Sequence, residues 1–158
     1  MKLYHGSNVT VSNPKILQSD RRLDFGTGFY LTSSIEQASR WANLTAQRRE
    51  SGKATVSVFE FDESMESSLR ILKFEKPDEK WLEFVTVNRK NLTIQNDDYD
   101  IIIGPVANDR TMPVISLYFS GLYDMEETIR RLLPQKLHDQ YTFRTEKALQ
   151  TLHFLEAK

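Results

Sequence analysis

The chain has 158 residues, 39% hydrophobic and 27% charged, which predicts one globular domain over residues 1–158 with a hydrophobic core of its own. A net charge of −1, from 21 basic and 22 acidic residues, gives no support for a protein that simply coats nucleic acid. The absence of cysteine excludes disulfides and thiolate metal sites. Because no long apolar run and no signal-peptide pattern is present, we expect a cytoplasmic protein without a membrane partner.

The first half of the chain predicts short strands around one long helix. Strands are expected at Met1–His5, Lys15–Leu17, Gly26–Thr32 and Ala54–Phe61, where β-branched and aromatic residues cluster or alternate. The segment after the third of these strands, SSIE, fits a capping box with Ser33 as the N-cap. The helix that it begins is expected to run to about Arg49.

The second half mixes further strands and helices. Leu69–Phe74 reads as a strand, and Pro77 suits the first turn of a helix whose buried stripe includes Trp81, Phe84 and Val85. Tyr99–Ile103 is a short apolar run typical of a strand buried on both faces, and the Gly-Pro pair after it is expected to end the strand.

The C-terminal part predicts a capped helix and two more strands. Asp124 begins the helix, and the strands are expected at Gln140–Phe143 and Thr151–Leu155 with a helical turn near Glu146–Leu149 between them. Because strands and helices alternate without a regular βαβ pattern, the fold class expected is α+β with a largely antiparallel sheet.

Several common chemistries have no support in the sequence. There is no phosphate loop of the GxxxxGK[ST] type and no GxSxG nucleophile elbow. The three histidines, His5, His138 and His153, are scattered, so no metal site is expected. Local basic clusters remain as a candidate patch, at Arg21-Arg22 and at Arg40, Arg48 and Arg49.

Three segments carry the residues best suited to a small polar ligand. Tyr4–Ser7 (YHGS) ends the first strand, and Gly28–Thr32 (GFYLT) leads into the long helix, which carries Trp41 eleven residues after Tyr30. The third segment is Asp139–Thr145 (DQYTFRT) near the C-terminus.

This ordered set resembles the ADP-ribosyltransferase superfamily, in the branch that includes diphtheria toxin and the poly-ADP-ribose polymerases, where the three key positions read His, Tyr, and Glu or a substitute. The chain is most similar to a bacterial family of unknown function in that superfamily, with the motifs F-G-x-G-F-Y-L-T, Q-A-x-x-W-A, N-R, Y-D-x-I-x-G-P-V-A-N-D and D-Q-x-x-F-x-T. In this sequence the motifs are Phe25–Thr32, Gln37–Ala42, Asn88-Arg89, Tyr99–Asp109 and Asp139–Thr145.

The resemblance implies a split antiparallel β-sheet sandwich with flanking helices and a bent NAD⁺, as co-substrate, bound across the split. His5 would then hydrogen-bond the ribose hydroxyls, and Gly6 would offer its backbone N–H and C=O to the nicotinamide carboxamide, which can approach a residue without a Cβ closely. Tyr30 and Trp41 would stack on the two faces of the nicotinamide.

Further contacts follow from the same resemblance. Ser7 and Thr32, which complete the first two motifs, are candidate cofactor-binding residues. Arg89 could contact an NAD⁺ phosphate, or could simply sit favourably at a helix C-terminus. Asn108 could line the site or form an Asx turn.

The third key position is Gln140, where many relatives have glutamate. Its amide can accept a hydrogen bond from the ribose 2′-hydroxyl, but it carries no charge to stabilise the cationic ribose. Asp139 is expected to point to the opposite face of the strand. The departure favours transfer of a single ADP-ribose over chain elongation.

The function expected is a bacterial mono-ADP-ribosyltransferase, with His5, Tyr30 and Gln140 as the catalytic residues. By family analogy it would act inside the cell as the toxin of a toxin–antitoxin or phage-defence pair, on a protein, RNA, DNA or small-molecule acceptor, with an antitoxin protein as partner. Three alternatives stay open: an NAD⁺-binding module without activity, an NAD⁺ glycohydrolase, and a metal-independent nuclease that uses His5.

Overall fold

A computed structural model describes residues 1–17, 23–90, 98–107 and 110–158. In chain order the elements are β1 (Lys2–Ser7), β2 (Phe29–Leu31), α1 (Ile35–Arg49), β3 (Thr55–Phe61), the 3₁₀ helix η1 (Glu63–Ser68), β4 (Ile71–Lys73), α2 (Glu79–Arg89), β5 (Ile101–Pro105), α3 (Met112–Phe119), α4 (Met125–Leu132), β6 (Asp139–Phe143), α5 (Glu146–Leu149) and β7 (Leu152–Ala157).

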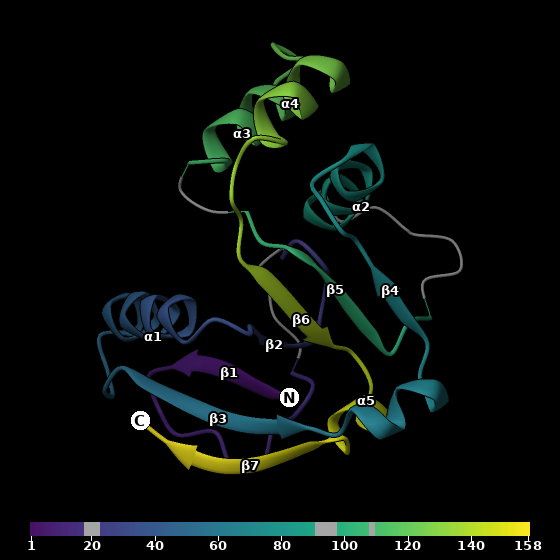
Figure 1. Cartoon of the computed structure of the whole chain (residues 1–158). Helices are drawn as coiled ribbons and strands as arrows, with labels where there is room; N and C mark the ends of the chain where they lie inside the picture. The colour runs from purple at the N-terminus through teal and green to yellow at the C-terminus, as the bar shows by residue number, and fades with distance from the viewer. Residues whose placement is uncertain (18–22, 91–97, 108–109) are drawn as a thin grey trace.

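The strands form two sheets. One has the order β1-β3-β7 and is antiparallel throughout; the other has the order β2-β6-β5-β4 and is antiparallel except for the β4–β5 pair. Figure 1 shows α1 beside β1 and β3 on one side of the molecule, with α2, α3 and α4 near the other sheet. The predicted α+β class with largely antiparallel pairing is confirmed.

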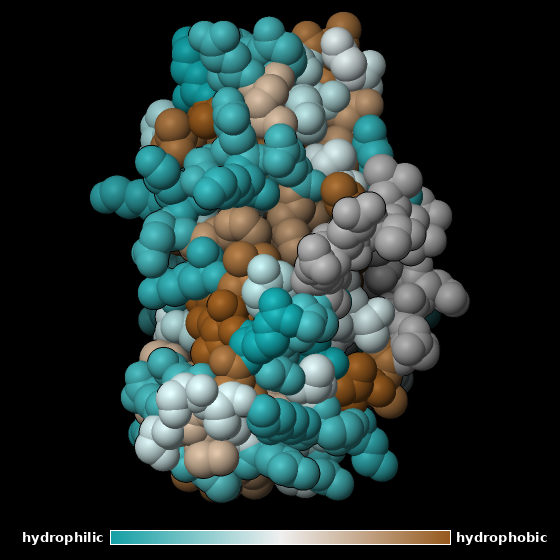
Figure 2. Space-filling model, turned by 90° about the vertical axis from the view of Figure 1, so that its right-hand side faces the viewer, coloured by the Kyte–Doolittle hydropathy of each residue, from teal (hydrophilic) through white to brown (hydrophobic). Residues whose placement is uncertain are grey.

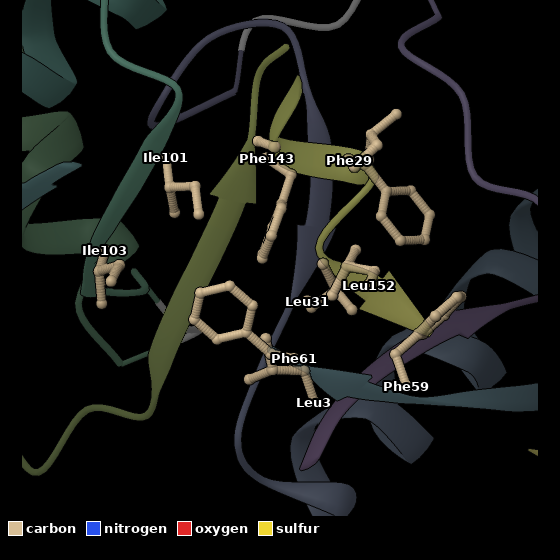
Figure 3. Packing of buried hydrophobic residues seen from close by; sticks show 11 residues of the cluster. Leu3, Phe29, Leu31, Phe59, Phe61, Ile101, Ile103, Phe143 and Leu152 are labelled. Carbon is tan, nitrogen blue, oxygen red and sulfur yellow. The ribbon is translucent and has the colours of Figure 1, made fainter. Parts of the chain in front are cut away.

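The main hydrophobic core lies between the two sheets. Phe61 of β3 packs against Phe143 of β6, and Figure 3 shows its ring on the same side as Ile101 and Ile103 of β5. Phe59 of β3 belongs to the same cluster and packs edge to face against Phe29 of β2. Phe61 and Phe143 touch edge to face, with ring centroids 5.5 Å apart. Burial of this apolar surface holds the sheets together.

Helices cover the outer faces of both sheets. Ile102, between the two isoleucines that face the main core, packs instead with Trp81 and Val85 of α2, with Ile115 of α3 and with Leu132 of α4. The run YDIII therefore has apolar neighbours on both faces, which is the arrangement that the sequence predicts. On the other sheet, α1 packs on β1 and β3 through small residues.

The surface on the side of α2 and β4 is mostly hydrophilic, with hydrophobic residues in separate patches (Figure 2). In the part of the chain that the structure describes, no helix combines the length and the apolar character that crossing a membrane requires.

Several boundaries differ from the sequence-based expectation. The expected strand at Lys15–Leu17 is absent. The strand expected at Gly26–Thr32 is shorter: β2 covers only Phe29–Leu31, because Gly26 has a φ of 79° and turns the chain before the strand begins. Pro77 precedes the N-cap Asp78 and so lies outside α2.

The N-cap of α1 is also shifted by one residue. Ser34 Oγ accepts a hydrogen bond from the backbone N–H of Gln37, while the Ser33 hydroxyl donates to the Asp139 carboxylate at 2.7 Å. Ser34 also donates to Glu36, so the expected reciprocal capping box is not formed.

β5 ends at the Gly104-Pro105 pair, as expected, but includes both residues. They pair with Gln140 and Asp139 of β6. Pro105 ends the strand, where its missing N–H costs least, and its carbonyl accepts a hydrogen bond from the Trp81 indole at 2.9 Å.

Candidate functional site

A cavity of about 660 Å³ opens where β1 and β2 diverge, within the size range of small-molecule sites. Its described lining comes from the end of β1 and the segment after it, Leu23 and Asp24, β2 with Gly28, one face of α1, Arg89 at the end of α2, residues 106–107 after β5, and Gln140 of β6. Segments far apart in the chain therefore meet around one space.

The free edge of β1 forms one wall of the cavity. Tyr4 pairs with Thr32, the residue after β2, through two backbone hydrogen bonds of 2.9 and 3.0 Å. Because backbone groups alternate in direction along a strand, the N–H and C=O of Gly6 point to the same side as those of Tyr4 and away from β3. Beyond this pair, that side is the opening between the sheets.

Gly6 needs to be glycine for a reason that the sequence did not reveal. A Cβ at residue 6 would lie 2.0 Å from the Ala38 carbonyl oxygen and 2.7 Å from the Ala42 nitrogen, both in α1. Close packing of the helix on the strand, rather than close approach of a ligand, is therefore the constraint that excludes a side chain.

His5 is held in one orientation and one tautomer. Its Nδ1 lies 2.7 Å from the Tyr30 carbonyl oxygen, and its ring stacks on Phe29 with centroids 4.3 Å apart. A carbonyl only accepts, so Nδ1 is the donor, and burial lowers the pKa of the imidazole despite the opposing effect of that hydrogen bond. In the neutral ring, Nε2 is then a hydrogen-bond acceptor.

Tyr30 lines the cavity with its hydroxyl group anchored. The hydroxyl donates to the Gly26 carbonyl at 2.5 Å and accepts from the Phe25 N–H at 3.2 Å. Burial, followed by the charge of Asp24, raises the pKa of the phenol well above its usual range. The phenol therefore stays neutral, and its hydrogen bonds position the ring.

Asp24 is a residue of the site that the sequence reasoning missed. It is only 5% exposed, and its Oδ1 accepts from Arg89 Nε at 2.5 Å. Its Oδ2 lies 3.4 Å from the Ala107 nitrogen and 3.5 Å from Gln140 Nε2. Asn88 Nδ2 donates to its backbone carbonyl at 3.1 Å. The adjoining motifs F-G-x-G and N-R were the only sequence signal for this cluster.

Gln140 and Asp139 face opposite ways on β6, as predicted. Gln140 is 2% exposed and lines the cavity, whereas Asp139 bonds Ser33 at the surface. Since Gln140 Nε2 points to Asp24, its Oε1 is the acceptor atom of the amide.

The face of α1 toward the cavity is aromatic and basic. Trp41 lines it together with Arg40, Arg48 and Arg49. Arginine side chains suit phosphate groups, which they bind with paired hydrogen bonds. The basic cluster that the sequence offered as a surface patch thus borders the same space as His5, apart from Arg21-Arg22, which lie outside the described residues.

The remaining candidates divide between the cavity and the protein interior. Ser7 and Arg89 line the cavity. Thr32 is fully buried, pairs with Tyr4 and accepts the Ser34 N–H at its hydroxyl, which supports the entry to α1; its contact with a ligand stays a prediction. Asn108 lies outside the described residues.

Comparison with known proteins identifies the family. The profile described as "Protein of unknown function (DUF3990)" matches residues 1–154. The chain belongs to this family. No curated protein and no solved structure gives a significant match.

Proposed function

We propose that this DUF3990 protein is an NAD⁺-dependent mono-ADP-ribosyltransferase, with the split-sheet sandwich of that superfamily and NAD⁺ bound in the cavity between β1, β2 and α1. The observation that carries the proposal is the pairing of two recognition elements at the opening: the outward backbone of Gly6 and the Nε2 acceptor of His5.

Gly6 matches the nicotinamide end of the dinucleotide. A carboxamide has one donor group and one acceptor, and the N–H and C=O of a single strand residue can satisfy both. Tyr30 and Trp41 supply aromatic faces in the same cavity. A cationic pyridinium gains on the order of 1–2 kcal/mol from each such face when water is excluded.

His5 and the arginines match the rest of the molecule. The acceptor nitrogen of His5 suits a ribose hydroxyl, which donates. Arg40, Arg48 and Arg49 along α1 suit the pyrophosphate. The polar groups of the cavity thus offer partners for the carboxamide, one ribose and the pyrophosphate of NAD⁺.

The reaction breaks the bond between nicotinamide and the ribose C1′, with the electron pair leaving on nicotinamide, which is neutral once free. Positive charge develops on the ribose, as in glycoside cleavage, and the acceptor's lone pair forms the new bond to C1′. No general acid is needed, so catalysis consists of positioning and electrostatic stabilisation.

The test is incubation of the purified chain with NAD⁺ labelled in the adenylate part, alone and with a bacterial lysate. We expect nicotinamide release, and label on a macromolecule that protease, RNase or DNase then identifies. His5→Ala should abolish both, while His153→Ala, on the exposed face of β7, should not. Free ADP-ribose without labelled acceptor would indicate a glycohydrolase, and binding without nicotinamide release a non-catalytic module.

We further propose that the enzyme acts as a toxin controlled by an antitoxin protein. Expression in a bacterial host should then arrest growth, and His5→Ala should relieve the arrest. Normal growth with active wild-type enzyme would refute the toxin role alone.

A further inference from the structure

The charges around the cavity are uneven. The described lining residues include five basic side chains, Lys15, Arg40, Arg48, Arg49 and Arg89. Asp24 is the one acidic residue among them. A carboxylate repels a dianionic pyrophosphate, so its presence in this cavity needs an explanation.

The two oxygens of Asp24 have different surroundings. Oδ1 is fully engaged by the 2.5 Å ion pair with Arg89. Within the described residues, Oδ2 has two contacts, both long, at 3.4 Å to the Ala107 nitrogen and 3.5 Å to Gln140 Nε2. Such contacts lie at the weak end of hydrogen bonding, so Oδ2 keeps capacity for a closer donor.

The carboxylate is also built in rather than incidental. It is 5% exposed and is held through Arg89 and, at its backbone carbonyl, through Asn88 of the same helix. Tyr30 lies near enough for the charge of Asp24 to affect its phenol. A purely structural ion pair would account for Oδ1 and Arg89, but not for the place of Asp24 in the cavity lining with its Oδ2 toward Gln140.

We propose that Asp24 is the catalytic carboxylate of this site, and that it supplies the negative charge that Gln140 lacks. The inference rests on the proposed function. Oδ2 accepts a hydrogen bond from a ribose hydroxyl and stabilises the positive ribose as the C1′–N bond breaks. The electron pair leaves with nicotinamide, the acceptor bonds to C1′, and the acceptor's proton passes to water. Gln140 and Arg89 are positioning residues that hold the carboxylate.

The experiment compares nicotinamide release by wild type, Asp24→Asn and Asp139→Asn over a range of NAD⁺ concentrations. Asp24→Asn keeps the size of the side chain but removes its charge, and should lower kcat by about 100-fold with KM changed by less than about threefold. Asp139→Asn removes a carboxylate one residue from Gln140 on the other face of β6, and should leave kcat within about twofold.

A charge-relocation series tests whether position 24 or position 140 carries the negative charge. Gln140→Glu would add a second carboxylate next to Asp24, and like charges at that separation oppose each other, so kcat should fall. Combining Gln140→Glu with Asp24→Asn should not restore activity. A higher kcat in Gln140→Glu, or rescue of Asp24→Asn by it, would overturn the inference and assign the charge to position 140.

Thermal melting checks that each variant is folded, and quenching of tryptophan fluorescence by NAD⁺ checks that it binds the ligand. If Asp24→Asn does not fold, Asp24→Ser takes its place, since it is uncharged, smaller and still polar. A folded variant at position 24 with wild-type kcat overturns the inference and leaves the proposed function intact. A wild-type protein that releases no nicotinamide overturns both.

Discussion

The two ends of the space between the sheets are built from the same strands but filled differently. At one end Leu3 of β1 and Phe59 of β3 are paired neighbours in the apolar core. Two residues further along β1, on the same face of the sheet, His5 pairs with Ser57 of β3. Phe29 belongs to both ends: it packs in the core and stacks on His5.

The difference separates stability from function along a single strand pair. Where side chains are apolar, the sheets close and exclude water; where they become polar, the sheets part and leave a cavity. Substitutions at the closed end are therefore expected to act on the free energy of unfolding. Substitutions at the open end should act on ligand binding, unless they also affect packing.

The largest effect is expected at the closed end. Phe61→Ala removes a ring that is fully buried against Phe143, and should cost about 3–5 kcal/mol of unfolding free energy because the cavity left behind cannot collapse completely. Phe154→Ala, on β7 at 37% exposure, is the matched control and should cost less than half as much. Equal losses in urea denaturation would mean that the inter-sheet core does not dominate stability.

Gly6→Ala tests the boundary between packing and function. The added methyl group would clash with the backbone of α1, so we expect a loss of about 1–3 kcal/mol together with weaker NAD⁺ binding as the helix moves. Gly121→Ala is the control: its φ is 83°, but nothing lies within 4 Å, so only conformational strain of about 1 kcal/mol applies. If Gly6→Ala costs no more than the control, the contact with α1 is not tight.

Much of the fold could be predicted because its signals are local. The Asp124 cap, the long helix and the strand at Gln140–Phe143 each depend on neighbouring residues, and all three are present. The two serines before α1 show the limit: both suit an N-cap, and the choice is decided by Asp139, 106 residues from Ser33.

The same limit explains what was missed at the site. The motifs identified His5, Tyr30 and Gln140, which line one cavity in the structure. Asp24 was not identified, because its place in the site depends on the ion pair with Arg89, which is 65 residues away in the chain. Likewise α3 (Met112–Phe119) was not predicted, because its residues are apolar almost throughout and show no helical period.

Tyr30→Phe should have a smaller effect, confined to the open end. It keeps the ring but leaves the Phe25 N–H and the Gly26 carbonyl without the phenol, at a cost of about 1–2 kcal/mol in unfolding free energy. NAD⁺ binding should persist if the ring is what contacts nicotinamide, whereas Tyr30→Ala should lose it. Binding lost to the same degree in both variants would contradict a stacking role.

The smallest effect concerns pH. Because burial lowers the pKa of His5 in the folded protein, the unfolded chain binds more protons at this residue between the folded pKa and about 6.5. Stability contributed by neutral His5 is thus present above about pH 6.5 and declines as the pH falls through that value toward the folded pKa. Urea denaturation at several pH values should show this decline in wild type, and less of it in His5→Phe, which keeps a ring over Phe29.

The lowered pKa of His5 also predicts a pH dependence of activity that differs from that of a histidine with an ordinary pKa. If Nε2 must stay unprotonated to accept from a ribose hydroxyl, the lowered pKa keeps it so, and kcat/KM for nicotinamide release should stay constant down through pH 6.5 and fall only below it. A loss of activity centred near pH 6.5 would mean that solvent reaches the imidazole freely, and that the open end of the sheets is wetter than its burial indicates.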